Sequence, residues 1–221
     1  MTPNVKTGLD RLRDGDYPLT PGQRVGLLCH AASVDQELRH AAGLVTRLCD
    51  NAGARLVRLF GPEHGVRGDA QDMIGVGDEP QKDPLLGLIV VSLYGAELSS
   101  LRPAPKHLED LDLPIIDLQD VGSRYYTYVW TLVLCLEVCA GMARPPRVLV
   151  LDRPNPLGGA MVEGPGIQAG FHSFVGLHDV PTRHGLTMGE LAQLCRAERN
   201  LDLELDVLQI QGWGRRDLFD N

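Results

Sequence analysis

Three side chains that could perform acid–base chemistry lie within five residues of one another, in the segment GPEHGVRG at 61–68. Glu63 is the candidate acid, and His64 and Arg67 accompany it. The glycines let backbone approach a ligand closely, and partial desolvation of a carboxyl group in such a loop favours its protonated form, as a general acid requires. A structural alternative stays open for Glu63, which would then cap the following turn or pair with Arg67. His64 would either contact the substrate or have only a structural role.

A second group of polar and aromatic side chains occupies the segment DLQDVGSRYYTY at 117–128. Asp117 and Asp120 lie three residues apart at the end of an apolar run, so at most one of them faces a cleft if the strand continues. The guanidinium fork of Arg124 suits a carboxylate, and Tyr126 could stack on a sugar or form a hydrogen bond with it.

The remaining candidates for substrate binding also follow apolar runs or precede a helical pattern. They are Tyr94, Asp152, Asn155, Arg183 and His184. Asp152 could equally be buried and hold the turn that follows it. Four arginines are candidate anion clamps, with the alternative that each pairs with Asp117, Asp120 or Asp152: Arg67, Arg124, Arg153 and Arg183.

Cofactor and metal signatures are absent from the sequence. The first strand leads into CHAASVD rather than GxGxxG, and neither GxxxxGK[ST] nor GxSxG occurs. A metal set could be drawn from His64, Asp120, Asp152 and His184, but no HxxxH or HxH pair supports it and arginines interleave with these residues. We therefore expect no metal and no cofactor.

The elements that must position these residues alternate between apolar runs and helical patterns. Buried strands are predicted within 24–30, 54–60, 86–94, 113–120, 147–152 and 203–210, and helices over 37–51, 124–142 and 187–199. This alternation is typical of an α/β fold with a mostly parallel sheet and helices on both faces. Right-handed crossovers place the carboxyl ends of the strands at one edge, where ligands bind in open α/β sheets.

Composition limits the function classes. The 221 residues are enough for one large domain, and 29 acidic against 21 basic residues give a net charge of −8. Such a chain is a poor binder of nucleic acid or of anionic membranes. Neither a membrane span nor a signal peptide is recognisable, so we expect a cytoplasmic protein. The five cysteines form no CxxC and are predicted to be thiols of the core.

Six long strings resemble the exo-β-N-acetylmuramidase NamZ family, which was long catalogued as a domain of unknown function. They are GPEHGVRGDAQ (61–71), SLYG (92–95), DLQDVGSRYYTYVWT (117–131), LDRPNPLGG (151–159), VEGP (162–165) and FVGLHDVPTRHGLTMGELA (174–192). The resemblance implies a Rossmann-like catalytic domain over 1–221. In the family a smaller auxiliary domain follows the segment 212–215, and we expect this chain to lack it.

The resemblance also implies hydrolytic release of terminal non-reducing N-acetylmuramic acid from peptidoglycan fragments, with a muropeptide or the disaccharide of N-acetylmuramic acid and N-acetylglucosamine as substrate. Glu63 matches the favoured catalytic residue, and an arginine would bind the lactyl carboxylate. We expect His64 and Asp120 to complete the catalytic set, with Asp152 as the alternative second carboxylate and the 2-acetamido group as an alternative nucleophile.

Two other readings stay open. The chain could be a silent muropeptide-binding domain, because it is expected to lack the auxiliary domain, or a metal-free hydrolase of another anionic sugar. The first strand departs from the family pattern, since His30-Ala31-Ala32-Ser33 stands where the family reads Asn-x-Ser/Thr-Gly. We expect this departure to alter specificity.

Overall fold

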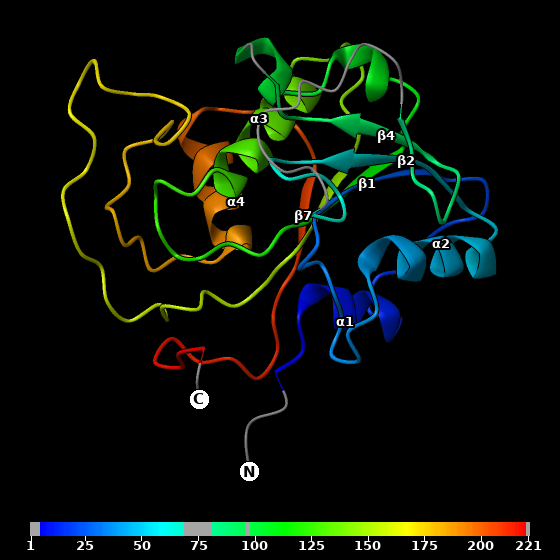
Figure 1. Cartoon of the computed structure of the whole chain (residues 1–221), viewed down its shortest axis with the longest axis horizontal. Helices are drawn as coiled ribbons and strands as arrows, with labels where there is room; N and C mark the ends of the chain where they lie inside the picture. The colour runs from blue at the N-terminus through cyan, green and yellow to red at the C-terminus, as the bar shows by residue number, and fades with distance from the viewer. Residues whose placement is uncertain (1–4, 69–80, 96–97, 220–221) are drawn as a thin grey trace.

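A seven-stranded sheet organises the chain in the computed structural model, which describes residues 5–68, 81–95 and 98–219 (Figure 1). The strands are β1 (Arg24–Cys29), β2 (Arg55–Gly61), β3 (Gln81–Lys82), β4 (Ile89–Ser92), β5 (Leu113–Asp117), β6 (Val148–Leu151) and β7 (Leu205–Leu208). The helices are α1 (Gly8–Arg13), α2 (Ala41–Ala52), α3 (Tyr128–Ala140) and α4 (Met188–Glu198), with short 3-10 turns η1 (Leu98–Leu101) and η2 (Pro105–His107).

The strand order places the centre of the sheet at its first strand. The order is β3-β4-β2-β1-β5-β6-β7, and all neighbouring pairs are parallel except the two-residue edge strand β3 against β4. From β1 the chain builds outward through β2 and β4, then returns to the other side of β1 for β5. This reversal makes the carboxyl ends of β1 and β5 a topological switch point, where open α/β sheets bind ligands. The predicted α/β fold with a mostly parallel sheet is confirmed.

Two apolar cores cover the two faces of the sheet, because successive side chains of a strand point to opposite faces. Leu27 of β1 packs in the α2-side core, formed with α1 and α2, whereas the next residue, Leu28, packs in the α3-side core. Figure 1 shows α3 and α4 together on one side of the strands and α1 and α2 on the other. Trp130 of α3 is fully buried in the α3-side core.

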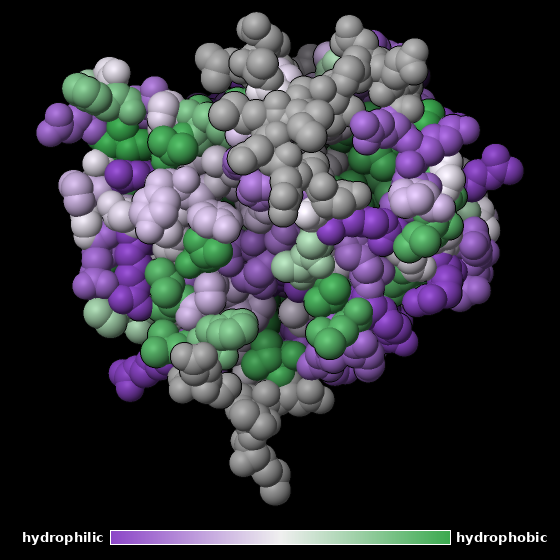
Figure 2. Space-filling model, in the orientation of Figure 1, coloured by the Kyte–Doolittle hydropathy of each residue, from purple (hydrophilic) through white to green (hydrophobic). Residues whose placement is uncertain are grey.

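The outer surface mixes polar and apolar side chains. On the face drawn in Figure 2, hydrophobic groups outside the grey region are small and are separated by polar residues. No helix in the described part of the chain is long and apolar enough to span a bilayer. All five cysteines are buried free thiols, as predicted from their sequence context.

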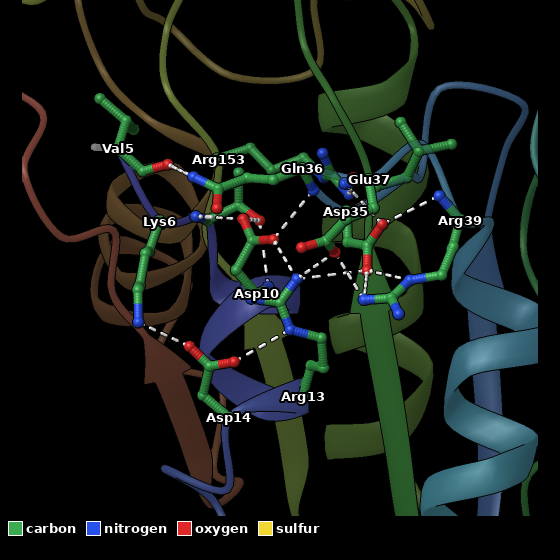
Figure 3. Close-up of polar contacts among 12 residues, drawn as sticks. Val5, Lys6, Asp10, Arg13, Asp14, Asp35, Gln36, Glu37, Arg39 and Arg153 are labelled. Atoms are coloured by element: carbon green, nitrogen blue, oxygen red, sulfur yellow. Dashed lines mark hydrogen bonds and ion pairs between the residues drawn. The ribbon is translucent and has the colours of Figure 1, made fainter. Parts of the chain in front are cut away.

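Helix α1 was not predicted, and a charged network explains how so short a helix is held. Thr7 and Asp10 form its capping box. Asp10 also accepts a hydrogen bond from the backbone N–H of Gln36 (3.0 Å), and Arg13 reaches Asp35 at 3.3 Å, as Figure 3 shows. The network therefore fastens α1 to the loop that follows β1.

Two predicted helices begin later than expected, each for a local reason. The predicted start at residue 37 is wrong because Asp35 organises a turn through residue 39, and α2 begins only after its cap, His40, whose Nδ1 accepts the N–H of Ala42. The predicted start at Arg124 is wrong because the backbone N–H of Arg124 bonds to Thr182 O, outside any helix. Five strands are shorter than predicted and lie within the expected segments. Strand β2 has the predicted length but is shifted by one residue, to Arg55–Gly61, and the edge strand β3 was not predicted.

Candidate active site

The carboxyl ends of the parallel strands bring most of the predicted residues to one edge. Glu63 follows β2, Tyr94 follows β4, Asp120 follows β5 and Asp152 follows β6. The central strand, β1, ends one residue before His30. The loop joining β6 to α4 carries Arg183 and His184 toward this edge, since Arg183 pairs by backbone with Ser123 after β5.

Glu63 lies where β2 ends and α3 begins. Its Oε2 accepts a hydrogen bond from the hydroxyl of Thr127 at 2.8 Å, and its backbone carbonyl accepts one from the Tyr128 hydroxyl at 3.3 Å. The side chain is half-buried, and no other described residue bonds to its carboxyl group. One carboxyl oxygen is therefore anchored by Thr127, while the other accepts no hydrogen bond from the part of the chain that the structure describes.

The loop after Glu63 has backbone that few residues adopt. His64 has φ +69°, and Gly65 and Gly68 have φ +75° and +72°. A left-handed conformation is uncommon for a residue other than glycine, and the side chain of His64 is exposed. Arg67, by contrast, forms two hydrogen bonds with the buried carboxylate of Asp83, at 2.7 and 3.0 Å.

His40 ties this loop to the end of β1. Its Nδ1 accepts from the helix backbone, so in the neutral ring the proton is on Nε2. That Nε2 lies 3.0 Å from the carbonyl of His30 and 3.2 Å from the carbonyl of Val66. One imidazole therefore holds the segments after β1 and β2 together.

Asp120 and His184 form a buried pair. His184 Nε2 lies 3.3 Å from Asp120 Oδ2, although the two are not aligned as a hydrogen bond. Oδ2 also accepts the backbone N–H of Gly122 at 2.8 Å, whereas Oδ1 has no partner among the described residues. His184 Nδ1 accepts the N–H of Leu186, which leaves the proton of the neutral ring on Nε2, toward Asp120.

Asp152 and Asn155 make contacts that hold the fold. At the start of α4, Asp152 accepts hydrogen bonds from the backbone N–H of Gly189 (2.8 Å) and the hydroxyl of Thr187 (3.1 Å). It also accepts one from the backbone N–H of the next residue, Arg153. Burial raises the pKa of Asp152 to about 6 in spite of these donors. Asn155 bonds to Leu186 O and to the N–H of Leu157. The alternative that Asp152 holds its turn has direct support.

The arginines differ in what neutralises them. Arg153 forms a buried, two-bonded pair with Asp117 at 2.6 and 2.9 Å, and Arg183 pairs with Glu163 at 2.7 Å. Arg124 donates to two backbone carbonyls, those of Pro165 and Val180, each at 2.7 Å. Among these three, only the charge of Arg124 meets no carboxylate in the described part of the chain.

The aromatic residues near the start of α3 have different exposures. Tyr126 is exposed and meets Tyr128 edge-on, with ring centroids 5.6 Å apart. Tyr128 is buried and packs against the ring of His30, at 4.6 Å. Tyr94 is half-buried, and its backbone N–H bonds to the hydroxyl of Ser92.

A continuous set of contacts joins the two carboxylates. It runs from Glu63 through Tyr128 to His30, whose Nε2 accepts the backbone N–H of Gln119, the neighbour of Asp120. Sequence reasoning placed Glu63 and Asp120 at this edge, and His30 at the end of the first strand, but it did not identify Thr127 as the residue that holds the carboxyl group of Glu63. Part of the motif at 61–71 and the whole of 72–80 lie outside the described residues.

The arrangement suits acid–base chemistry on a polar ligand. Among the residues that the structure describes, it contains an anchored carboxyl group with one oxygen that has no partner, a buried Asp–His pair with one unpartnered oxygen, and a guanidinium without a carboxylate partner. In the described part of the chain, no cluster of three or more His, Cys, Asp or Glu side chains is placed to hold a metal ion.

Comparison with known proteins gives a family model and a curated relative that match most of the chain. The family model described as exo-beta-N-acetylmuramidase NamZ, N-terminal, matches residues 25–221. The peptidoglycan beta-N-acetylmuramidase NamZ of Bacillus subtilis (strain 168) is 40% identical over 221 residues, which are 99% of this chain and 50% of that protein.

Two crystal structures of DUF1343 family proteins from Bacteroides fragilis NCTC 9343 have similar folds. One has a TM-score of 0.84 and is 35% identical; the match covers 98% of this chain and 52% of the Bacteroides chain. The other has a TM-score of 0.77 and 28% identity, covering 97% and 54%. The chain thus spans about half the length of the relatives that it matches.

Proposed function

We propose a function from the premise that this chain belongs to the exo-β-N-acetylmuramidase NamZ family. The proposed reaction is hydrolysis of the glycosidic bond that joins a terminal, non-reducing N-acetylmuramic acid to the rest of a peptidoglycan fragment, as in cell-wall turnover and recycling. The observation that carries the proposal is the half-buried carboxyl group of Glu63, anchored through one oxygen at the ligand-binding edge of the sheet.

Glu63 acts as the general acid. It donates its proton to the glycosidic oxygen as the bond from that oxygen to the anomeric carbon breaks, and water adds to the anomeric carbon and supplies the proton that restores the acid. The hydroxyl of Thr127 fixes the orientation of the carboxyl group. His64 is close in sequence and exposed, which suits contact with the leaving part of the substrate.

Asp120 is the second catalytic carboxylate in this proposal, and Asp152 is not. Each oxygen of Asp152 already accepts hydrogen bonds that hold α4, whereas Oδ1 of Asp120 is a buried oxygen without a hydrogen-bond partner among the described residues. His184 lies against the other oxygen of Asp120 and orients it. Asp120 then activates water, or orients the 2-acetamido group if that group is the nucleophile.

Arg124 is the proposed ligand of the lactyl carboxylate. A fragment carrying that anion needs a local cation in a chain of net charge −8. The described partners of Arg124 are neutral carbonyls, so its positive charge is not cancelled in place. A guanidinium offers the carboxylate a planar pair of donors. Tyr126, which is exposed and lies two residues further along the chain, is the proposed aromatic contact for the sugar.

The decisive experiment compares turnover of a chromogenic N-acetylmuramic acid glycoside by the wild type and by Glu63→Gln. Loss of a general acid lowers the rate by about 10²-fold or more. Glu109→Gln is the matched control, because Glu109 is exposed and precedes β5, at the opposite edge of the sheet. It should leave turnover unchanged.

Three outcomes would contradict this assignment. An unchanged rate in Glu63→Gln would remove Glu63 from the mechanism. Stabilisation of the wild type by N-acetylmuramic acid without any turnover would favour a binding domain instead. Turnover of an N-acetylglucosamine glycoside alone would indicate a different sugar. The cytoplasmic location stays a prediction, which cell fractionation would test.

A further inference from the structure

His30 occupies the switch point of the sheet. It follows the last residue of β1, and its ring reaches the segment after β5, where Nε2 accepts the backbone N–H of Gln119 at 3.0 Å. The reversal of strand order between β1 and β5 is where this class of sheet binds ligands. Among the charged and polar side chains at the edge, His30 is therefore the most central.

The hydrogen bond to Gln119 fixes the tautomer of His30. A backbone N–H can only donate, so Nε2 of His30 must be the acceptor and carries no proton. The proton of the neutral ring is consequently on Nδ1. Burial, reinforced by the nearby charge of Arg153, lowers the pKa of His30 to about 4, so the ring is neutral at ordinary pH.

The ring is held in one position by its surroundings. Tyr128 packs against it, the backbone N–H of His30 bonds to the Ser33 hydroxyl at 3.0 Å, and His40 bonds to its carbonyl. The residue is only 6% exposed. A side chain fixed in this way has already lost its rotamer freedom, so a contact with ligand costs little further ordering.

The Nδ1–H donor of His30 takes part in none of these contacts. No described residue accepts a hydrogen bond from Nδ1, and Nδ1 is not among the fully buried atoms without a partner in the described part of the chain, so it keeps some exposure to solvent. Through Tyr128 the ring is one contact removed from Glu63. A neutral N–H can donate to a charged or an uncharged oxygen. Because Arg124 is available for the anion, we assign this donor to an uncharged oxygen of the sugar.

We infer that His30 contacts the substrate and helps to determine specificity, donating its Nδ1–H to an uncharged oxygen of the bound sugar, of which an N-acetyl carbonyl is the strongest acceptor. This inference rests on the proposed glycosidase function. His30 transfers no proton. Its role is to position the sugar ring whose glycosidic bond Glu63 protonates.

Two substitutions separate this role from a purely structural one. The amide of glutamine reaches the place of Nε2, so His30→Gln keeps an acceptor for Gln119 and loses the Nδ1 donor. The amide of asparagine lies at the place of Nδ1, so His30→Asn keeps that donor and loses the acceptor. The measurements are kcat and KM for the chromogenic N-acetylmuramic acid glycoside and the melting temperature of each full-length variant.

We expect His30→Gln to raise KM about tenfold with kcat and melting temperature nearly unchanged, as for one lost neutral hydrogen bond. We expect His30→Asn to melt about 2–4 °C lower, because the Gln119 N–H loses its partner, while KM rises by no more than about threefold. The pH profile of kcat/KM should keep its shape in both variants, because a neutral donor does not titrate.

Each opposite result overturns the inference. If the variant with the lower melting temperature, His30→Asn, also has the larger increase in KM, His30 has only a structural role. If an inflection of the pH profile disappears in His30→Gln, His30 is an acid or base. A wild type that turns over while His30→Gln keeps a normal KM overturns this inference alone. A wild type that neither binds nor hydrolyses the sugar overturns the proposed function as well.

Discussion

Directly beneath the site, Asp117 and Arg153 form an ion pair that is almost completely removed from solvent. Their side chains are 0% and 5% exposed, and Arg153 also donates to the carbonyl of Val34 at 3.0 Å. A buried pair of this kind adds little over an apolar pair, yet removing one partner strands the other charge. The pair therefore fixes the carboxyl end of β5 against the loop after β1.

From this follows a stability prediction. Arg153→Leu should lower the free energy of unfolding by about 3–5 kcal/mol, because Asp117 is left buried and unpaired. Urea unfolding followed by circular dichroism measures it. Arg147→Leu is the control, because Arg147 is exposed and pairs with Glu204 at the surface, so little change is expected. Equal effects of the two substitutions would contradict the prediction.

Two other buried groups near the site shift toward their neutral forms with opposite consequences for pH dependence. Burial raises the pKa of Asp152 to about 6 and lowers that of His30 to about 4. Between about pH 4 and 6 the native protein binds more protons than the unfolded chain at Asp152 and fewer at His30. Stability therefore falls with rising pH because of Asp152 and rises because of His30.

Substitution of one of these two residues should leave the pH dependence of stability that the other contributes. Between about pH 4 and 6, the free energy of unfolding of Asp152→Asn should increase relative to that of the wild type as the pH rises. The free energy of unfolding of His30→Gln should decrease relative to that of the wild type over the same interval. Each difference should change by up to about 3 kcal/mol. Urea titrations at about pH 4, 5 and 6 give these slopes. Curves that stay parallel to the wild type would show that neither group titrates in this window.

At the residue scale, the sequence predicted where the chemistry lies better than it predicted what each side chain contacts. Glu63 and Asp120 could be placed at one edge because each follows an apolar run. The partners of Asp152, by contrast, are Thr187 and Gly189, more than 30 residues later. Such pairings depend on how α4 packs on β6, which spacing along the chain does not contain.

At the scale of elements, capping residues and apolar periodicity gave most of the helices. Thr187 and Glu190 form a capping box at the start of α4, and Gly53 ends α2 in a left-handed conformation, which are residue types typical of these helix ends. Helix α1 escaped prediction because six residues provide less than two turns of periodicity. Its stability comes from long-range contacts, among them the hydrogen bond from the N–H of Gly8 to Asp152 O at 2.7 Å.

Helix α1 approaches the sheet so closely that its first residue must be glycine. A Cβ at Gly8 would lie 2.5 Å from the N atom of Asp152 and 2.6 Å from both Leu151 Cα and Leu208 O. These are backbone atoms, which cannot rotate away. Gly8→Ala should therefore destabilise the protein by at least about 1–3 kcal/mol, the range for overpacking a well-filled core.

Gly43 provides the matched control for Gly8→Ala. It lies in α2, and apart from its chain neighbours and the backbone of its own helix no atom lies within 4 Å of a Cβ built there. Gly43→Ala should stabilise by about 0.5–1 kcal/mol, because alanine loses less backbone entropy in a helix. Thermal unfolding of both variants gives the comparison. A neutral Gly8→Ala would mean that α1 does not remain docked on β6 and β7.

At the scale of the whole molecule, the sheet is shared between two cores. Leu27 and Leu28, adjacent in β1, contribute to different cores, and so do Ile115 and Ile116 in β5. Neither core can lose its packing without releasing strands that the other core needs. The site residues lie at the end of the same strands, so their geometry depends on both faces at once.

This shared sheet predicts a single unfolding transition, which can be tested from one face by a probe on the other. In a Trp213→Phe background, the fluorescence of Trp130 reports the α3-side core, because the chain has two tryptophans. Leu27→Ala lies in the α2-side core, where it should cost about 2.7–5 kcal/mol. Because the strands couple the cores, the Trp130 transition and the circular dichroism transition should move together to lower urea. A Trp130 transition that stays in place while circular dichroism becomes biphasic would show that the faces unfold separately.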